Sequence, residues 1–138
     1  MQIKQISVFL ENNAGRLGEV TGVLARAGIN MRAISIADTA DFGILRLIVD
    51  NTEAAVKALS AGGFTIRETS VAAVEIQDSP GSLAQVMELF QKSKVNIEYL
   101  YASLSGKAGK AVVIFKLEDH EKGLQIVKEN GLSTVEVF

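Results

Sequence analysis

Two short loops contain the residues best suited to bind a small polar molecule. One reads Asp78-Ser79-Pro80-Gly81-Ser82-Leu83 and the other reads Asn12-Asn13-Ala14-Gly15-Arg16-Leu17. Each loop follows an alternating apolar segment and precedes apolar residues at helical spacing, so each is expected to join a strand to a helix. A glycine at such a turn lets the backbone approach a ligand, and the free N–H groups of the first helical turn suit a carboxylate.

The loop with the acidic residue has groups for both ends of an amino acid. Its first helical turn would bind a carboxylate, and Asp78 would bind an ammonium group beside it. The same residues also form an ordinary helix start, with Asp78 or Ser79 as the N-cap and Pro80 in the first turn. Taken alone, one such loop leaves both interpretations open.

A second repeated element is an asparagine between two apolar residues, as Ile29-Asn30-Met31 and Val95-Asn96-Ile97. Each asparagine stands where the predicted helix gives way to the next strand. It could adopt a left-handed or turn conformation there. Its side-chain amide could instead reach a ligand on a neighbouring module, and the two interpretations stay open at this stage.

These elements recur because the chain contains an internal repeat. Gly15 aligns with Gly81 and Asn30 with Asn96 at an offset of 66 residues, and apolar positions of the intervening helix match as well. Further on, Gly63 aligns with Gly131 at an offset of 68 residues. The second copy has therefore gained two residues, and we place them in a predicted hairpin turn at 105–109, where insertions are tolerated.

Each copy reads as strand, helix, two strands, helix and strand. In the first copy the strand signals cover 6–10, 30–38, 43–49 and 64–69, with a turn at 39–41, a helix that ends at Gly28, and a helix that starts at an N-cap on Thr52 and ends at Gly62 and Gly63. In the second copy the strands are 71–77, 96–104, 110–117 and 134–137, and the helices are 82–93 and 120–129, the latter with Asp119 as N-cap.

The predicted fold is α+β, with two tandem ferredoxin-like βαββαβ modules, residues 1–70 and 71–138. Each module is a four-stranded antiparallel sheet with two helices on one face. Residues 64–76 contain no Gly or Pro, so the last strand of one copy runs almost directly into the first strand of the next. The third strands, 44–49 and 112–115, are apolar on both faces, so we expect the other copy or a second chain to cover the face without helices.

Composition excludes several classes of function. Apolar residues make up 48% of the 138 residues and aromatic residues 6%, which predicts an aliphatic core. A net charge of −2 and a pI of about 5.4 give no basic field for nucleic acid or an anionic membrane. The chain has no cysteine, no apolar run that could span a membrane and no signal-peptide pattern at its start, so we expect a cytoplasmic protein.

The sequence contains no recognisable catalytic motif. The single histidine, His120, has no partners for a metal cluster and is expected at the start of a surface helix. No serine-based catalytic motif is recognisable, and the lysines around Gly109 lack phosphate-loop spacing. We therefore expect a protein that is not an enzyme and needs no metal or cofactor.

The repeated pattern resembles the ACT domain family, and most closely its small stand-alone tandem members. The resemblance rests on a strand, a D-x-P-G-x-L loop, a helix and a hydrophobic-Asn-hydrophobic triplet. The matching residues are Asp78, Pro80, Gly81, Leu83, Val95, Asn96 and Ile97 in the second copy and Gly15, Leu17, Ile29, Asn30 and Met31 in the first.

The resemblance implies a regulatory module that binds a free L-amino acid at an interface between ACT modules. Carried over by position, the ligand-binding residues are Asn12, Asn13, Ala14, Gly15, Arg16, Leu17, Asn30, Met31, Asp78, Ser79, Pro80, Gly81, Ser82, Leu83, Asn96 and Ile97. The first copy departs from the pattern, because Asn12 replaces the acidic residue and Ala14 replaces the proline. Arg16 would either neutralise an acidic ligand side chain or lie solvated on the helix.

The resemblance and the apolar sheet faces together imply a homodimer with a partner enzyme of amino-acid metabolism, and leave the identity of the amino acid open. The alternatives are an RNA-binding module of the same topology or a purely structural interaction protein. Asp41-Phe42-Gly43-Ile44 is similar to an aromatic RNA-stacking motif, but the acidic pI and aliphatic strands speak against RNA.

Overall fold

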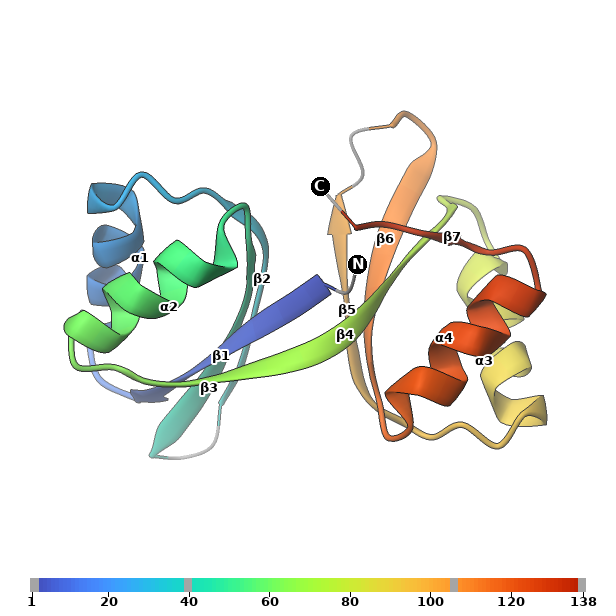
Figure 1. The fold of residues 1–138 in the computed structure, drawn as a ribbon, viewed down its shortest axis with the longest axis horizontal. Helices are drawn as coiled ribbons and strands as arrows, with labels where there is room; N and C mark the ends of the chain where they lie inside the picture. The colour runs from blue at the N-terminus through green and yellow to red at the C-terminus, as the bar shows by residue number, and fades with distance from the viewer. Residues whose placement is uncertain (1–2, 39–40, 105–106, 137–138) are drawn as a thin grey trace. The chain divides into compact units, whose positions relative to one another are not determined.

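The computed structural model describes residues 3–38, 41–104 and 107–136 and divides into two compact units (Figure 1). The N-terminal unit is Lys4–Thr69, and the C-terminal unit comprises Ile3 with the described residues from Ser70 onward. Each unit places two helices on one face of its sheet. The predicted α+β class with two βαββαβ modules is confirmed.

The N-terminal unit contains a sheet of order β2-β3-β1-β4. β3 runs antiparallel to both β1 and β2, with Leu47 paired to Ile6 on one side and to Ile34 on the other. Its elements are β1 (Ile3–Glu11), α1 (Arg16–Arg26), β2 (Met31–Asp38), β3 (Phe42–Val49), α2 (Thr52–Ala61) and the first part of β4 (Thr65–Gln77).

The C-terminal unit repeats this arrangement with the second part of β4 as its first strand. The strand order is β5-β6-β4, with β7 on the other side of β4. Its further elements are α3 (Ser82–Lys92), β5 (Ile97–Leu104), β6 (Lys110–Leu117), α4 (His120–Glu129) and β7 (Ser133–Thr134). The insertion expected at 105–109 and the turn expected at 39–41 fall partly on residues 39–40 and 105–106, outside the described residues.

Two strand predictions need correction. The last strand of the first copy and the first strand of the second form one continuous strand of 13 residues, β4. The strand predicted at 134–137 is only Ser133–Thr134, because pairing with β4 is limited to Thr134 with Val74 and Ser133 with Glu75. One further hydrogen bond, from Val135 N to Ala73 O, ends the contact at 2.8 Å.

Each unit has its own aliphatic core between sheet and helices, built by period-two strands and amphipathic helices. The N-terminal core includes the fully buried Ile6, Val8, Val20, Leu24, Leu45, Leu47, Ala55 and Leu59. The C-terminal core includes Val74, Val86, Phe90, Val113, Phe115, Leu117, Ile126 and Val127. Phe90 and Phe115, which replace Leu24 and Leu47 of the first copy, meet edge to face with ring centroids 5.3 Å apart. On the opposite face of β6, Val112 and Ile114 are buried as well.

The second helix of each unit begins at a side-chain cap, as the sequence predicts for Asp119. Asp119 Oδ1 accepts a hydrogen bond from Lys122 N at 3.1 Å. In α2 the cap is Asn51, whose Oδ1 accepts from Ala54 N at 3.0 Å, so the predicted cap at Thr52 is wrong by one residue. Asn51 has the extended backbone that an N-cap requires, whereas Thr52 is already the first residue of α2.

The contact between α4 and β6 shows how the two cores have diverged together. A Cβ added to Gly123 would overlap Cδ1 of Leu117, which is fully buried. At the equivalent places of the N-terminal unit stand Ala55 and Val49. In the C-terminal unit the larger strand residue, Leu117, thus faces the smaller helix residue, Gly123. The combined side-chain volume of this pair is close to that of Val49 with Ala55.

Gly123→Ala is therefore expected to lower the free energy of unfolding by about 1 kcal/mol or more, because overpacking exceeds the gain in helix propensity. Leu117→Val in the same chain is expected to restore most of the loss, since it recreates the pair found in the N-terminal unit. Urea unfolding of both single variants and the double variant measures the coupling. Additive effects would contradict the volume compensation.

The turn after the first helix of each unit needs a left-handed residue. Gly28 takes this conformation after α1 with φ 70°, and Lys94 takes it after α3 with φ 58°. Both turns close with the same hydrogen bonds, from Ile29 N to Leu24 O and from Val95 N to Phe90 O, each 2.9 Å. This is a common way for a helix to end, and glycine adopts it at lower cost than any other residue.

Lys94→Gly is expected to raise the free energy of unfolding by about 0.5–1 kcal/mol, because it removes the left-handed strain of a residue with a Cβ. The melting temperature and the urea midpoint measure the change. An exposed lysine of helix α3, Lys92, is the control: Lys92→Gly is expected to destabilise, since it places glycine in the last turn of the helix and removes the ion pair with Glu88. Equal effects of the two substitutions would show that the turn is not strained.

Candidate functional site

The two predicted loops have the same backbone conformation. Gly15 is the N-cap of α1 with φ 88° and ψ −15°, and Gly81 is the N-cap of α3 with φ 88° and ψ −11°. Both are left-handed, and a Cβ at either glycine would meet nothing within 4 Å. Glycine is therefore required by the turn of the chain, and the space beside it is open.

The alternative of an ordinary capped helix start at Asp78 or Ser79 is wrong. Neither α1 nor α3 has a side-chain hydrogen bond at its cap. Ser79 Oγ lies 2.8 Å from Ser82 Oγ, and Pro80 precedes the N-cap and so stands outside the first turn. The left-handed glycine turns the preceding residues away from the position that a capping side chain occupies.

The backbone donors of these two helices are consequently open. The first intrahelical hydrogen bonds are donated by Glu19 N to Gly15 O and by Gln85 N to Gly81 O. Among the described residues, no acceptor meets the N–H groups at the second and third helical positions, which are Leu17 and Gly18 in α1 and Leu83 and Ala84 in α3. Exposed donors of this kind, at the positive end of the helix dipole, can bind a carboxylate.

The side chains of the C-terminal loop are exposed at this opening. Asp78, Ser79, Pro80 and Leu83 are exposed and Ser82 is half-buried. The loop is anchored by its backbone, because Asp78 N donates to Gly109 O at 2.9 Å. Asn12 N donates to Asp41 O at the same distance in the first copy, so both loops start from equivalent anchors.

The N-terminal loop differs in its side chains. Asn13 Nδ2 donates to Glu11 Oε2 at 3.1 Å. Arg16 forms an ion pair with Glu19, and its guanidinium lies 5.0 Å from the centre of the Phe64 ring. Arg16 is therefore half-buried and held by contacts within its own unit, and its predicted role toward a ligand stays a prediction.

The two asparagines lie at the start of the second strand of each unit. Both are exposed, and their carbonyls accept hydrogen bonds from Asp50 N at 3.1 Å and from Glu118 N at 3.0 Å. Neither asparagine has a left-handed backbone; the left-handed residues of these two turns are Gly28 and Lys94. The backbone of Asn30 and Asn96 thus joins two strand ends, and Met31 and Ile97, which follow, are the half-buried first residues of their strands.

Within one unit the loop and the asparagine lie at opposite ends. The loop of the N-terminal unit adjoins the pairs Glu11–Phe42 and Asp38–Gly43, whereas Asn30 adjoins the pair Met31–Val49. Helix α1 separates them, and 11 residues of helix span roughly 16 Å. The C-terminal unit has the same arrangement around α3. One module alone does not bring both predicted elements together.

Leu17 and Leu83, which the sequence analysis placed in the two loops, are 41% and 36% exposed. Two further exposed aliphatic side chains at equivalent positions were missed by the sequence analysis, Ile34 at 50% and Leu100 at 37%. Ile34 pairs with Leu47, and Leu100 with Phe115, so both lie on the helix side of their sheets, on edge strands. The signal in the sequence was the repeat, because each pair is related by the offset of 66 residues.

The described residues hold no group of three or more His, Asp or Glu side chains suited to a metal ion. His120 is the half-buried first residue of α4. No helix in the described part of the chain is long and apolar enough to cross a membrane.

Comparison with known proteins shows the family of the chain. The family model described as ACT domain pair matches residues 1–137. The chain belongs to the ACT domain pair family. Protein BT0572 from Bacteroides thetaiotaomicron is similar over 98% of this chain and 92% of its own, with 39% identity and a TM-score of 0.92. A comparison with curated proteins finds no match.

The ACT fold of this chain also resembles regulatory subunits of aspartate kinase. The subunit from Thermus thermophilus has 20% identity and a TM-score of 0.65, with 93% of this chain and 91% of that chain covered. The subunit from Thermus flavus has 18% identity and a TM-score of 0.65, with 94% and 92% covered. At these identities the likeness concerns the fold.

The open donors of the two ACT modules can be tested by amide hydrogen exchange. Ala54 and Lys122, at the third position of the capped helices, are expected to exchange more slowly than Gly18 and Ala84, at the same position of the uncapped ones, after correction for intrinsic rates. NMR-detected exchange without ligand measures the difference. Comparable protection of all four amides would show that the donors of α1 and α3 are already satisfied.

Proposed function

We propose that this ACT domain pair is a non-catalytic regulator that binds a free L-amino acid. The observation that carries the proposal is the contrast between its helices. The helices with Gly15 and Gly81 as N-cap residues have open backbone donors, whereas side chains of Asn51 and Asp119 cap the other two. The open ends recur at the first helix of both modules, whereas the second helix of both modules is capped.

The proposed ligand contacts follow from charge and exposure. The carboxylate binds the N–H groups of Leu83 and Ala84, where the helix dipole favours negative charge. The ammonium group binds Asp78, which is exposed ahead of the same turn. The loop of the first copy has Asn12 in place of this acid, so its donors bind the carboxylate without a charged partner for the ammonium group.

A module that binds in this way has its asparagine at the far end of the helix, so the amide must come from another module. We place the ligand between ACT modules of paired chains, with Asp78–Leu83 or Asn12–Leu17 from one module and Asn96–Ile97 or Asn30–Met31 from its neighbour. The exposed Ile34 and Leu100 on the edge strands support such pairing. The homodimer that this requires is measured by size-exclusion chromatography with light scattering.

The regulated activity resides in another protein, with which the pair communicates by changing association or shape when the amino acid binds. Aspartate kinase regulatory subunits with this fold give the class of partner, an enzyme of amino-acid metabolism. The family model spans residues 1–137, and no catalytic domain is indicated in them.

A thermal-shift screen of the twenty amino acids is expected to identify one or a few that raise the melting temperature. Ligand at about 100 times its Kd adds roughly 2.7 kcal/mol to the free energy of unfolding. Gly81→Ala is expected to weaken binding at least about tenfold, because its Cβ occupies the open space beside the donors and costs one charge-assisted hydrogen bond.

Gly131→Ala is the matched control for this experiment. Gly131 is also left-handed, with φ 67°, and a Cβ there also meets nothing within 4 Å, but it follows α4. Both variants are expected to lose similar stability, and only Gly81→Ala is expected to lose the ligand. The N-acetylated form of the amino acid tests Asp78, since it lacks the ammonium group. Unchanged binding to Gly81→Ala would place the ligand elsewhere.

RNA binding is the second candidate function, because two aromatic side chains are exposed on the sheet. Phe9 and Phe42 are 40% and 59% exposed, and the pairs Phe9–Ile44 and Glu11–Phe42 make them diagonal neighbours on the face away from the helices. Aromatic residues on this topology can stack on bases. A flat amino-acid screen together with binding of oligo-RNA would favour this candidate over the sensor.

A further inference from the structure

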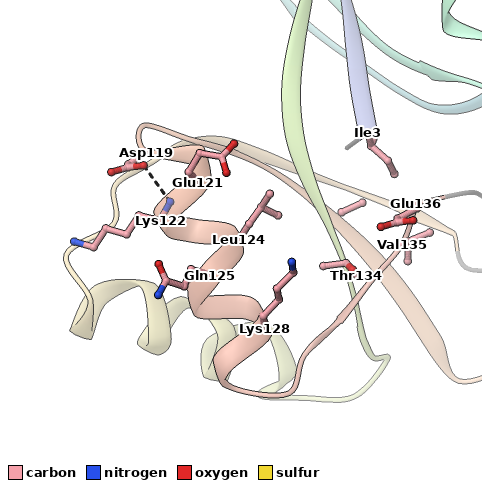
Figure 2. A pocket seen from close by; sticks show the side chains of 11 residues that line it. Ile3, Asp119, Glu121, Lys122, Leu124, Gln125, Lys128, Thr134, Val135 and Glu136 are labelled. Carbon is pink, nitrogen blue, oxygen red and sulfur yellow. Dashed lines mark hydrogen bonds between the residues drawn. The ribbon is translucent and has the colours of Figure 1, made fainter. Parts of the chain in front are cut away.

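The C-terminal unit contains a pocket that lies apart from the two loops. It has a volume of about 650 Å³ and lies between α4, β4 and β7 (Figure 2). Its apolar lining comes from Ile3, Ala73, Leu124 and Val135, of which Ile3 and Ala73 are buried. A pocket of this size fits a small organic molecule.

One side of the pocket is formed by the end of the short strand β7 and the residues that follow it. After Thr134 the strand keeps a single backbone hydrogen bond to β4, from Val135 N to Ala73 O. Helix α4 presents Glu121, Leu124, Gln125 and Lys128 to the space beside it, at the spacing of one helical face. Leu124 on this face is only half-buried by its own unit.

The charges around the pocket include two lysines, Lys122 and Lys128, that form no ion pair within the described residues. Glu121 and Glu136 each have an interaction partner, and Asp119 caps α4. Lys128 forms no ion pair within the described part of the chain. Its ammonium group rises from α4 on the side of Thr134, whereas that of Lys122 points away from this space, as Figure 2 shows.

We infer that this pocket binds a small monocarboxylate with an aliphatic chain. The carboxylate pairs with Lys128 and can accept a hydrogen bond from the Thr134 hydroxyl. The chain lies on Leu124 and Val135. An uncharged or cationic molecule of the same shape leaves Lys128 unpaired and binds less well. This site is independent of the amino-acid site proposed above, because no residue of either loop lines it.

Hexanoate is a suitable probe, in an NMR titration of the intact, 15N-labelled chain. A Kd on the order of 1 mM is expected for a molecule of this size, with saturable shifts at the amides of Leu124, Lys128 and Thr134. Lys128→Gln is expected to weaken binding about fivefold, which is the effect of losing a partly exposed ion pair. Hexylammonium is expected to bind more weakly than hexanoate.

Lys57→Gln, the same change at an exposed lysine of α2, is the matched control and is expected to leave the Kd unchanged. Gly81→Ala is expected to bind hexanoate normally, which separates this site from the loop site. The inference is overturned by linear shifts without saturation, by shifts centred on Leu83 and Ala84, or by equal binding of hexanoate to Lys128→Gln and to the unaltered chain.

Discussion

The unsatisfied N–H groups at the starts of α1 and α3 are the constraint on which the candidate site depends. A helix leaves its first N–H groups without partners, and a protein normally satisfies them with a side chain or with water. Here a left-handed glycine occupies the capping position, so the donors face solvent. Water bound there can be displaced by a carboxylate, which forms stronger, charge-assisted hydrogen bonds to the same groups.

The two copies differ in core side chains but share the backbone conformation of the glycine at this turn. Phe90 and Phe115 stand where the first copy has Leu24 and Leu47, and Leu117 with Gly123 replaces Val49 with Ala55. The N-cap glycines nevertheless have φ values of 88° in both copies and ψ values within a few degrees. Core side chains can be exchanged when the total volume is kept. The backbone angles of a turn that presents N–H donors in one direction can vary much less.

Sequence reasoning succeeded where a periodic signal or the repeat itself was available. The strands and the helices follow from spacing, and the glycine loops from their duplication. The caps were harder, because Asp50, Asn51 and Thr52 are all good capping residues in a row and only the backbone selects Asn51. At Ser79 the chemistry of the side chain suggested a cap that the left-handed Gly81 prevents. The pocket beside Lys128 was not foreseen, since its lining comes from segments far apart in the chain.

Because the loop and the asparagine of one module lie at opposite ends of a helix, binding of an amino acid as proposed would also affect how two modules pair. If the amino acid contacts a loop of one module and an asparagine of another, its binding energy contributes to holding the two together. By linkage, a ligand that binds the paired modules better than the separate ones must strengthen the pairing by the same factor. A module with both contacts at one end of α1 would bind the amino acid with no such effect. Under the proposed function, the length of the helix between Gly15 and Asn30 thus couples binding of the amino acid to the pairing of modules.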